Sequence, residues 1–320
     1  MSFLQQDSAA LSDVDTSLLL DEFGGMVESQ FAKASVLRQF VPVYRVTGTD
    51  TLVNNRVGRT QLQKLIPGVR PDPKQTGFGK AQVTIDTVVL ARDSRSMLNE
   101  LQVHFSARAA LAEDQGKELG KFFDQAFIIQ SIKGAGQAAP TGLNGAFGAG
   151  KSVTLSLAGD ESDPDKLYNA IASVIVQMEE EDIDVSEIVI MVSPTRFDIL
   201  LRNDKLVSKF YSEGNANYAQ AELHYLKGAR IVKTARIPSA AITGHYLSNA
   251  LNGNAYDVSA TEAKTVAVIL HPKSLLAGET IPLTSDIFYD KTDKTWYIDS
   301  FLAFGVNVNR PDVCGRVLKQ

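Results

Sequence analysis

The chain has 320 residues, of which 44% are hydrophobic and 22% are charged, so it has the composition of a globular protein with material for a sizeable core. Its formal net charge of −5 argues against a general nucleic-acid binder, which needs lysine and arginine to neutralise phosphates. The single cysteine, Cys314, excludes an internal disulfide.

Nothing in the sequence indicates secretion or membrane insertion. The N-terminal residues include acids and lack the basic start and apolar run of a signal peptide. The longest apolar runs are too short to span a bilayer. We therefore expect a soluble intracellular product with no membrane partner.

Residues 17–40 are expected to form an amphipathic helical arm. Apolar residues recur there at helical spacing, at Leu19, Phe23, Met26, Val27 and Phe31. Gly24 and Gly25 weaken this helix, because glycine has a low helix propensity. The apolar face needs a partner surface, and Phe23 and Phe31 are our candidates for a contact with another subunit.

Residues 48–82 differ from the rest of the chain in being basic and poor in apolar side chains. The only acids in this range are Asp50 and Asp72, whereas the bases are Arg56, Arg59, Lys64, Arg70, Lys74 and Lys80. A basic, core-poor segment in an acidic chain predicts an excursion from the body. Residues 83–91 then have the pattern of a strand.

If residues 48–82 form a two-armed hairpin, each arm of roughly 15 residues would reach about 50 Å. A compact body of this length has a radius of gyration of about 20 Å, so the hairpin would overshoot its own domain. Such a hairpin makes physical sense if it lies on another subunit with acidic surface. We predict that its contact residues are Arg56, Arg59, Lys64, Arg70 and Lys74, and that glutamate at the first two hinders assembly without unfolding the chain.

The second part of the chain mixes helices and strands without a regular alternation, which predicts an α+β fold. Residues 107–133 form one long predicted helix, and a glycine- and alanine-rich connection follows at 134–151. Further helices are expected to start at Asp163-Pro164 and Ser193-Pro194. Strands are predicted at 153–157, 187–193 and 296–309, and residues 220–290 have the pattern of short strands and turns.

The stretch GAFGAGKS, residues 145–152, matches the phosphate-binding loop G-x-x-x-x-G-K-S/T of nucleotide hydrolases. A working loop of this kind follows a buried strand and opens a helix at its lysine. Here the preceding residues are too rich in glycine and alanine for a core strand, and the following residues, VTLSL, predict a strand. A P-loop nucleotide hydrolase stays open as an alternative, although the sequence on both sides of this stretch argues against it.

Other chemical motifs are weak, and we expect no catalytic residue, cofactor or metal site. The histidines are isolated in sequence, at His104, His224, His245 and His271. Cys314 has no neighbouring histidine and is better explained as a packed thiol than as a nucleophile. The acids between Asp160 and Asp165 fit helix capping better than a calcium loop. The acids at 179–182 are either a solvated face or a docking site for a basic partner.

Taken in order, five segments resemble the major capsid proteins of tailed phages, which have the HK-ninety-seven-type fold, and most closely the T-seven-like podovirus coat proteins. The five segments resemble, in turn, the N-terminal arm, the extended loop, the strand leading to the spine helix, a helix start in the axial domain and the closing peripheral strand. They are residues 18–46, 58–68, 83–98, 193–203 and 301–318.

The resemblance implies a division of the chain into an N-terminal arm (1–47), an extended loop (48–82), a peripheral domain with the spine helix (83–154), an axial domain (155–285) and closing peripheral strands (286–320). It implies a non-enzymatic coat protein that assembles into hexamers and pentamers of an icosahedral shell around double-stranded DNA. The arm and the extended loop would lie on neighbouring subunits, and a procapsid would mature to a larger shell.

The resemblance also implies partners and a location. Because the arm begins near residue 17, a separate scaffolding protein is expected; a portal protein and, in some relatives, decoration proteins are further partners. Assembly would take place in the host cytoplasm and the product would be part of the virion. An encapsulin-type nanocompartment, which has the same fold but encloses an enzyme cargo, stays open as an alternative.

Overall fold

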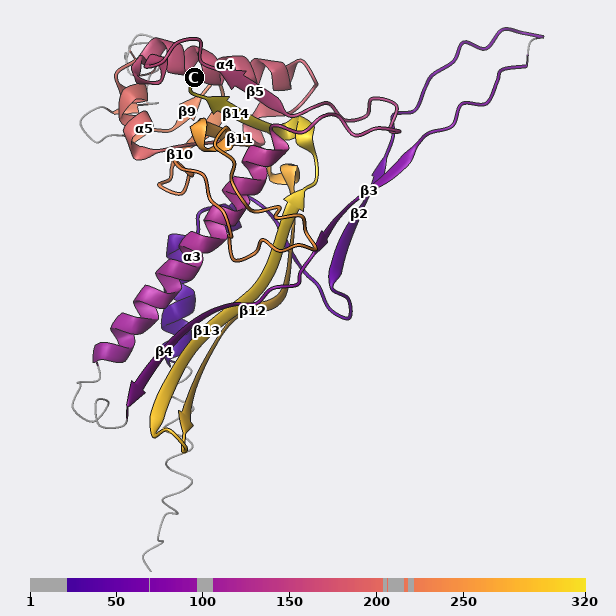
Figure 1. The fold of residues 1–320 in the computed structure, drawn as a ribbon. Coiled ribbons are helices and arrows are strands. Elements are labelled where there is room, and N and C mark those ends of the chain that lie inside the picture. The colour runs from indigo at the N-terminus through magenta and orange to yellow at the C-terminus, as the bar shows by residue number, and fades with distance from the viewer. Residues whose placement is uncertain (1–21, 69, 97–105, 204–205, 207–215, 218–221) are drawn as a thin grey trace, which may run out of the picture. The chain divides into compact units, whose positions relative to one another are not determined.

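The computed structural model describes residues 22–68, 70–96, 106–203, 206, 216–217 and 222–320 (Figure 1). The chain divides into two compact units. The first takes the described parts of Met1–Gln39, Ile85–Asp124 and Glu279–Phe304, and the second those of Phe40–Thr84, Gln125–Gly278 and Gly305–Gln320. Helix α3 (Ser106–Gly134) and strands β12 (Leu275–Asp290) and β13 (Thr295–Val308) contribute residues to both units.

The first unit is built on the long strands. Strand β4 (Val89–Ser96) pairs antiparallel with β13, from Thr295 opposite Ser96 to Leu302 opposite Val89. The strand order of this sheet is β1-β12-β13-β4, where β1 is Val43–Arg45. Residues 22–34 are helical, and the short 3-10 helix η1 (Leu37–Gln39) follows them.

Small residues on α3 let the helix over residues 22–34 approach closely. A Cβ added at Gly116 would lie 2.5 Å from the carbonyl oxygen of Val27, and one at Gly120 would lie 2.8 Å from the Cβ of Ala34. Phe31 packs edge-on against Phe123, with ring centroids 5.6 Å apart. The helix is therefore held by close packing against its own chain.

The second unit contains a six-stranded sheet in the order β5-β14-β11-β6-β10-β9. Its strands are β5 (Lys151–Thr154), β14 (Cys314–Leu318), β11 (Thr265–Leu270), β6 (Val189–Val192), β10 (Ala229–Lys233) and β9 (Tyr225–Leu226). Strand β11 runs antiparallel to both of its neighbours, whereas β5 and β14 are parallel, as are β6 and β10. Every residue of β6 and β11 is buried, so the hydrophobic runs of both strands lie in the core.

Two helices of the second unit begin at the predicted caps. Asp163 accepts hydrogen bonds from the backbone amides of Asp165 and Lys166 at the start of α4 (Pro164–Glu179). Ser193 accepts one from Arg196 at the start of α5 (Pro194–Leu201). One face of α4 is buried with β5 and β14 in a core of Leu167, Ile171, Val174, Ile175, Val317 and their neighbours. Short 3-10 helices occur at Asp160–Ser162 (η2), Val185–Glu187 (η3), Glu262–Lys264 (η4), Pro272–Ser274 (η5) and Pro311–Val313 (η6).

The predicted hairpin is present in the second unit. Strand β2 (Thr51–Val57) pairs antiparallel with β3 (Phe78–Thr84), from Thr51 opposite Thr84 to Val57 opposite Phe78. The ladder has seven residues on each strand, shorter than the expected 15 per arm, and the chain between them is not in strands. A second small hairpin joins β7 (Ala216–Asn217) to β8 (Glu222–Leu223).

Three predictions from sequence need correction. Residues 83–91 are not one strand: β3 ends at Thr84, where its pairing with β2 ends, and β4 begins at Val89, where pairing with β13 begins. The strand predicted at 153–157 runs from Lys151 to Thr154. Residues 220–290 include the six-residue β11 and most of the 16-residue β12, which are longer than the short strands that we expected.

Candidate interaction surface

The extended loop, residues 48–82, is fixed at its root by polar side chains. The Asn54 amide donates to the Asn309 Oδ1 atom at 2.8 Å, and the Asn307 amide donates to the carbonyl oxygen of Gln82 at 2.7 Å. The Arg56 guanidinium donates to the carbonyl oxygens of Val308 and Asn309. Both strands of the hairpin are thus bound to the C-terminal end of β13 and the turn after it.

Arg56 therefore has partners within its own chain. Its side chain is half-buried, and burial lowers its pKa from the ordinary value, while Asp312 raises it and Arg310 lowers it further. A glutamate at this position would face two carbonyl oxygens. We now expect such a change to disturb the loop root itself, in addition to any subunit contact.

The loop tip, residues 59–76, exposes nearly all of its described side chains. Three large apolar residues stand out, because Leu62 is 93%, Leu65 70% and Ile66 52% exposed. The Gln63 amide donates to the carbonyl oxygen of Asp72 at 2.8 Å and ties the two sides of the tip together. Exposed apolar side chains gathered on one segment are a common feature of interaction surfaces.

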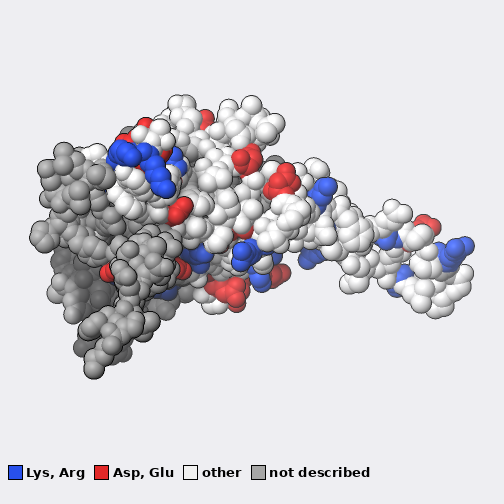
Figure 2. Space-filling view, turned by 90° about the horizontal axis from the view of Figure 1, so that it is seen from below, with Lys and Arg blue, Asp and Glu red and all other residues white. Residues whose placement is uncertain are grey.

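Four of the five basic residues that we predicted for subunit contact lie on this tip, and the fifth, Arg56, lies in β2 at the root. Arg59, Lys64, Arg70 and Lys74 are all exposed. The projection at the right of Figure 2 is this hairpin, and it carries several Lys and Arg side chains and few acids. The tip thus combines exposed apolar and cationic side chains, which suit an apolar surface edged with carboxylates on a partner.

Phe23 and Phe31 lie in the interior of the first unit. Both side chains are only 2% exposed. Phe23 packs with Val27, Ala112, Ile287 and Ile298. The apolar face of this helix is thus covered by its own chain, and a role for these two residues at a subunit contact stays a prediction.

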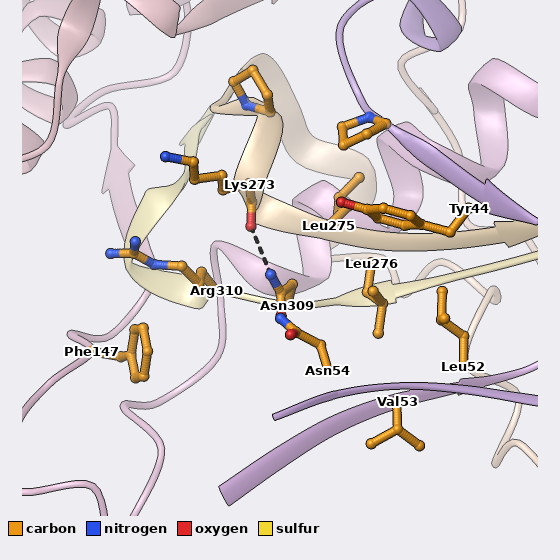
Figure 3. A pocket seen from close by; sticks show the side chains of 12 residues that line it. Tyr44, Leu52, Val53, Asn54, Phe147, Lys273, Leu275, Leu276, Asn309 and Arg310 are labelled. Atoms are coloured by element: carbon orange, nitrogen blue, oxygen red, sulfur yellow. Dashed lines mark hydrogen bonds between the residues drawn. The ribbon is translucent and has the colours of Figure 1, made fainter. Parts of the chain in front are cut away.

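A groove with a cavity volume of about 550 Å³ lies beside the root of the hairpin. In Figure 3, Lys273, Arg310 and Phe147 stand at one end and Tyr44 and Leu52 at the other. The Arg310 guanidinium lies 5.0 Å from the centre of the Phe147 ring and also pairs with Asp312. Apolar walls with cations at one end suit a chain segment that carries apolar and acidic side chains.

The stretch GAFGAGKS does not form a phosphate-binding loop. Lys151 and Ser152 begin strand β5, which pairs in parallel with β14, so no helix starts there. The Lys151 ammonium pairs with Glu181, and the Ser152 hydroxyl accepts from the Arg316 guanidinium at 3.0 Å. Residues 135–150, which precede β5, contain no strand. A phosphate would therefore meet neither a helix N-terminus nor a free lysine.

Two of the four histidines and the cysteine lie in structural contacts. The His271 Nε2 atom lies 2.9 Å from Glu187, and its Nδ1 atom accepts from the backbone amide of Lys273. Buried His245 accepts from the amide of Leu247. Cys314 is fully buried, which raises the pKa of its thiol to about 12. His224 is exposed, and His104 lies outside the described residues.

Within the described ranges, no group of three or more His, Cys, Asp and Glu side chains is placed to hold a metal ion. Among the helices that the structure describes, none combines the length and the hydropathy that crossing a membrane requires.

The sequence interpretation missed the residues that hold the loop in place. Asn54, Asn307 and Asn309 were not recognised as root contacts, and Leu143 and Asn144 were treated as part of a flexible connection. The available signal was the presence of Gly58, Gly77 and Gly79 within the predicted hairpin, since glycines mark places of close backbone approach.

Comparisons with known proteins agree on the fold. No protein-family model and no curated protein matches the chain. A solved structure described as the asymmetric unit of the bacteriophage PhiM1 mature capsid is similar over 89% of this chain and 87% of that one, with a TM-score of 0.78 and 27% identity. The capsid of cyanophage P-SCSP1u covers 90% and 88%, with a TM-score of 0.78 and 15% identity. A virus-like particle from Pyrococcus furiosus covers 93% and 99%, with a TM-score of 0.55 and 14% identity. The fold is thus the HK-ninety-seven-type fold of phage capsid subunits.

Proposed function

We propose that this protein is the major capsid protein of a bacteriophage and assembles into an icosahedral shell. The observation that carries this proposal is the likeness to the PhiM1 capsid subunit, which covers nearly all of both chains. A chain that matches a shell subunit over 89% of its length shares the fold from which such a subunit is built. The protein is accordingly a structural protein of the virion and not an enzyme.

The finer features of this function are part of the same proposal. The chain would form hexamers and pentamers around double-stranded DNA. Among phage coat proteins, it would be most closely related to those of the T-seven-like podoviruses. A separate scaffolding protein, a portal protein and, in some particles, decoration proteins would be its partners, and assembly in the host cytoplasm would precede maturation. The chain's net charge of −5 supports a shell that does not bind packaged DNA tightly, because each phosphate contact would add affinity.

In this proposal the chain keeps the division into arm (1–47), extended loop (48–82), peripheral domain (83–154 and 286–320) and axial domain (155–285). The loop tip would contact the neighbouring subunit through Arg59, Lys64, Arg70 and Lys74 and through the exposed apolar residues beside them. The exposure of this tip supports such a contact, because an exposed apolar cluster is unfavourable in an isolated subunit and is covered in an assembled one.

An encapsulin-type nanocompartment is less well supported. The PhiM1 and cyanophage structures, each with a TM-score of 0.78, are both capsids of phages. The two functions differ in content: a phage shell holds DNA, and a nanocompartment holds an enzyme. Nuclease-protected DNA in particles from infected cells supports the phage capsid, whereas a co-purified enzyme in DNA-free particles supports the nanocompartment.

Sedimentation combined with negative-stain microscopy on the recombinant chain tests the proposal. Shells, tubes or ring-shaped capsomers, formed alone or with a co-expressed scaffolding protein, are the expected result. A monodisperse monomer or dimer under both conditions would overturn the capsid assignment.

A further inference from the structure

The glycine-rich segment at residues 140–147, between α3 and β5, touches the extended loop where its two strands end. We propose that this segment is a latch, which fixes the direction in which the loop tip projects from the rest of the second unit. The inference concerns the isolated chain and goes beyond the proposed function, because it would hold whatever the tip contacts. It also gives a structural role to the first three residues, 145–147, of the stretch that resembles a phosphate-binding loop.

Hydrogen bonds join the latch to both sides of the loop. The amide of Arg59 donates to the carbonyl oxygen of Leu143 at 3.0 Å, and this oxygen also accepts from the amide of Ala146. The side-chain amide of Asn144 lies 3.2 Å from the carbonyl oxygen of Gln75 and 3.5 Å from that of Arg59. One residue thus reaches both the outgoing and the returning chain.

Glycines on the loop make this approach possible. A Cβ added at Gly77 would lie 1.8 Å from the carbonyl oxygen of Gly142, and one added at Gly58 would lie 2.8 Å from that of Leu143. Both distances are far below a normal contact. Neither glycine has a positive φ, so its backbone conformation is open to any residue and closeness to the latch is what excludes a side chain. The buried Leu143 side chain also packs on Gly79, where an added Cβ would lie 3.3 Å from its nearest methyl carbon, a milder contact than the other two.

The residues on either side of the latch are joined to each other and to the body of the second unit. The amide of Gly150 donates to the carbonyl oxygen of Gln137 at 2.9 Å, and β5 starts at the next residue. The Phe147 ring packs against the Arg310 guanidinium. A displacement of the loop is therefore resisted by the sheet and not only by the segment itself.

Two separate attachments fix the direction of the hairpin relative to the rest of the second unit, whereas a single attachment would let the hairpin turn about it. The root contacts of Asn54, Arg56 and Asn307 hold the hairpin at one place, and the latch holds it near Gly58 and Gly77. If the latch opens, the root contacts and the β2–β3 ladder can stay intact while the tip turns. The latch thus controls direction without controlling whether the hairpin exists.

Limited tryptic digestion of the unassembled chain tests this inference, because the tip carries both a probe and an internal reference. The bond after Arg59 is held by the latch, whereas the bond after Lys64 is on the exposed tip. Asn144→Ala removes the bridge between Arg59 and Gln75 and should raise cleavage at Arg59 relative to Lys64 at least about five-fold, the effect of losing one ordinary hydrogen bond. The left-handed backbone at this position, with φ of 52°, suits asparagine better than alanine, so the substitution loosens the latch backbone as well. Gly77→Ala should raise this ratio further.

The controls separate the latch from general destabilisation. Gln61→Ala changes an exposed tip residue and should leave the cleavage ratio at the wild-type value. Hydrogen exchange should speed up at the amides of Arg59 and Ala146, while the amides of residues 51–57 stay protected. Equal cleavage ratios in wild type and Asn144→Ala would overturn the latch, as would exchange that rises evenly over the whole hairpin. Because Asn144 is exposed, its variant keeps the test valid if Gly77→Ala fails to fold.

Discussion

At the scale of single residues, burial decides how the few reactive side chains behave. Cys314 begins β14 and is completely enclosed, with its Sγ atom 3.4 Å from the carbonyl oxygen of Arg310. Gly134 on α3 packs against it so closely that an added Cβ would lie 2.8 Å from the sulfur. The sequence already predicted a packed thiol, because no histidine stands near the cysteine in the chain.

We expect this thiol to be unreactive in the folded chain. Burial raises its pKa to about 12, so at neutral pH almost no thiolate is present to react. A maleimide reagent should label less than about a tenth of the native protein in an hour at pH 7 and all of it in urea, as measured by intact mass. Rapid labelling of the native protein would show that the C-terminal strand opens.

His271 makes the stability of the second unit depend on pH. Burial lowers its pKa, Glu187 and Asp184 raise it, and Lys273 and Arg310 lower it, with burial the largest effect. Below the ordinary histidine pKa of about 6.5, the unfolded chain binds a proton that the folded chain does not. The free energy of unfolding should therefore fall as the pH decreases through 6.5, before the carboxylates begin to titrate.

Urea titrations between about pH 7.5 and 5.5 measure this effect. His271→Asn keeps an acceptor for the amide of Lys273 and removes the titrating group, so its stability should fall less over this range than that of the wild type. His224→Asn, at an exposed position, is the matched control and should follow the wild type. Parallel curves for wild type and His271→Asn would contradict the prediction. His245, whose pKa burial also lowers, accounts for the part of the slope that remains.

At the scale of elements, the sequence predicted helices and strands well where the residues of one segment alone determine its structure. The long helix was predicted at 107–133 and is found at Ser106–Gly134, and the strand predicted at 296–309 is Thr295–Val308. The caps at Asp163 and Ser193 start their helices as expected. In each case a periodic pattern or a capping residue carries the information within a few positions.

Elements that depend on distant partners were predicted less well. Residues 83–91 have a uniform β pattern, but Thr84 pairs with Thr51 and Val89 pairs with Leu302, so the strand is divided by two different partners. The length of β12 follows from its long neighbour β13, and its own sequence, with Gly278 and Pro282, contains residues that weaken strands. Pairing of this kind is not encoded near the residues that it orders.

The position of Lys151 in strand β5 argues against nucleotide binding by the stretch at residues 145–152. Because Lys151 is its first residue and pairs with Glu181, we expect no ATP binding by equilibrium dialysis with labelled nucleotide. Lys151→Ala should be no different from wild type in this assay. Saturable binding that Lys151→Ala abolishes would restore the hydrolase alternative. Glu181→Gln is a useful second variant, since it frees the lysine without removing it.

At the scale of the whole molecule, the fold could be expected from the order of five weak resemblances, whereas the geometry of the loop could not. The predicted excursion at 48–82 was inferred from charge and missing apolar residues, and the hairpin is present. The assignment of Arg56 to a subunit contact did not anticipate its bonds to Val308 and Asn309, because these partners lie about 250 positions away in the chain. Sequence indicated that the loop exists, and only the tertiary contacts show what holds it.

The loop tip offers charge and apolar surface together, and assembly experiments can separate the two. Lys64→Glu with Lys74→Glu reverses exposed charges, so it should slow assembly most at low salt, where the Debye length is long, and less at about 1 M salt. Leu62→Ser with Leu65→Ser removes exposed apolar area, so it should slow assembly at all salt concentrations. Light scattering and sedimentation follow the rate and the yield of shells.

Lys227→Glu with Lys264→Glu reverses two exposed charges of the same unit, one in the turn between β9 and β10 and one in η4, and so matches the change in net charge. If this control slows assembly as much as the tip lysine variant, net charge and not the tip is responsible. If neither tip variant alters the rate or the yield at any salt concentration, the tip does not contact a neighbour. A salt-dependent defect confined to the lysine variant, together with a salt-independent defect in the leucine variant, would mean that attraction guides the tip to a neighbouring subunit and that apolar burial then holds it there.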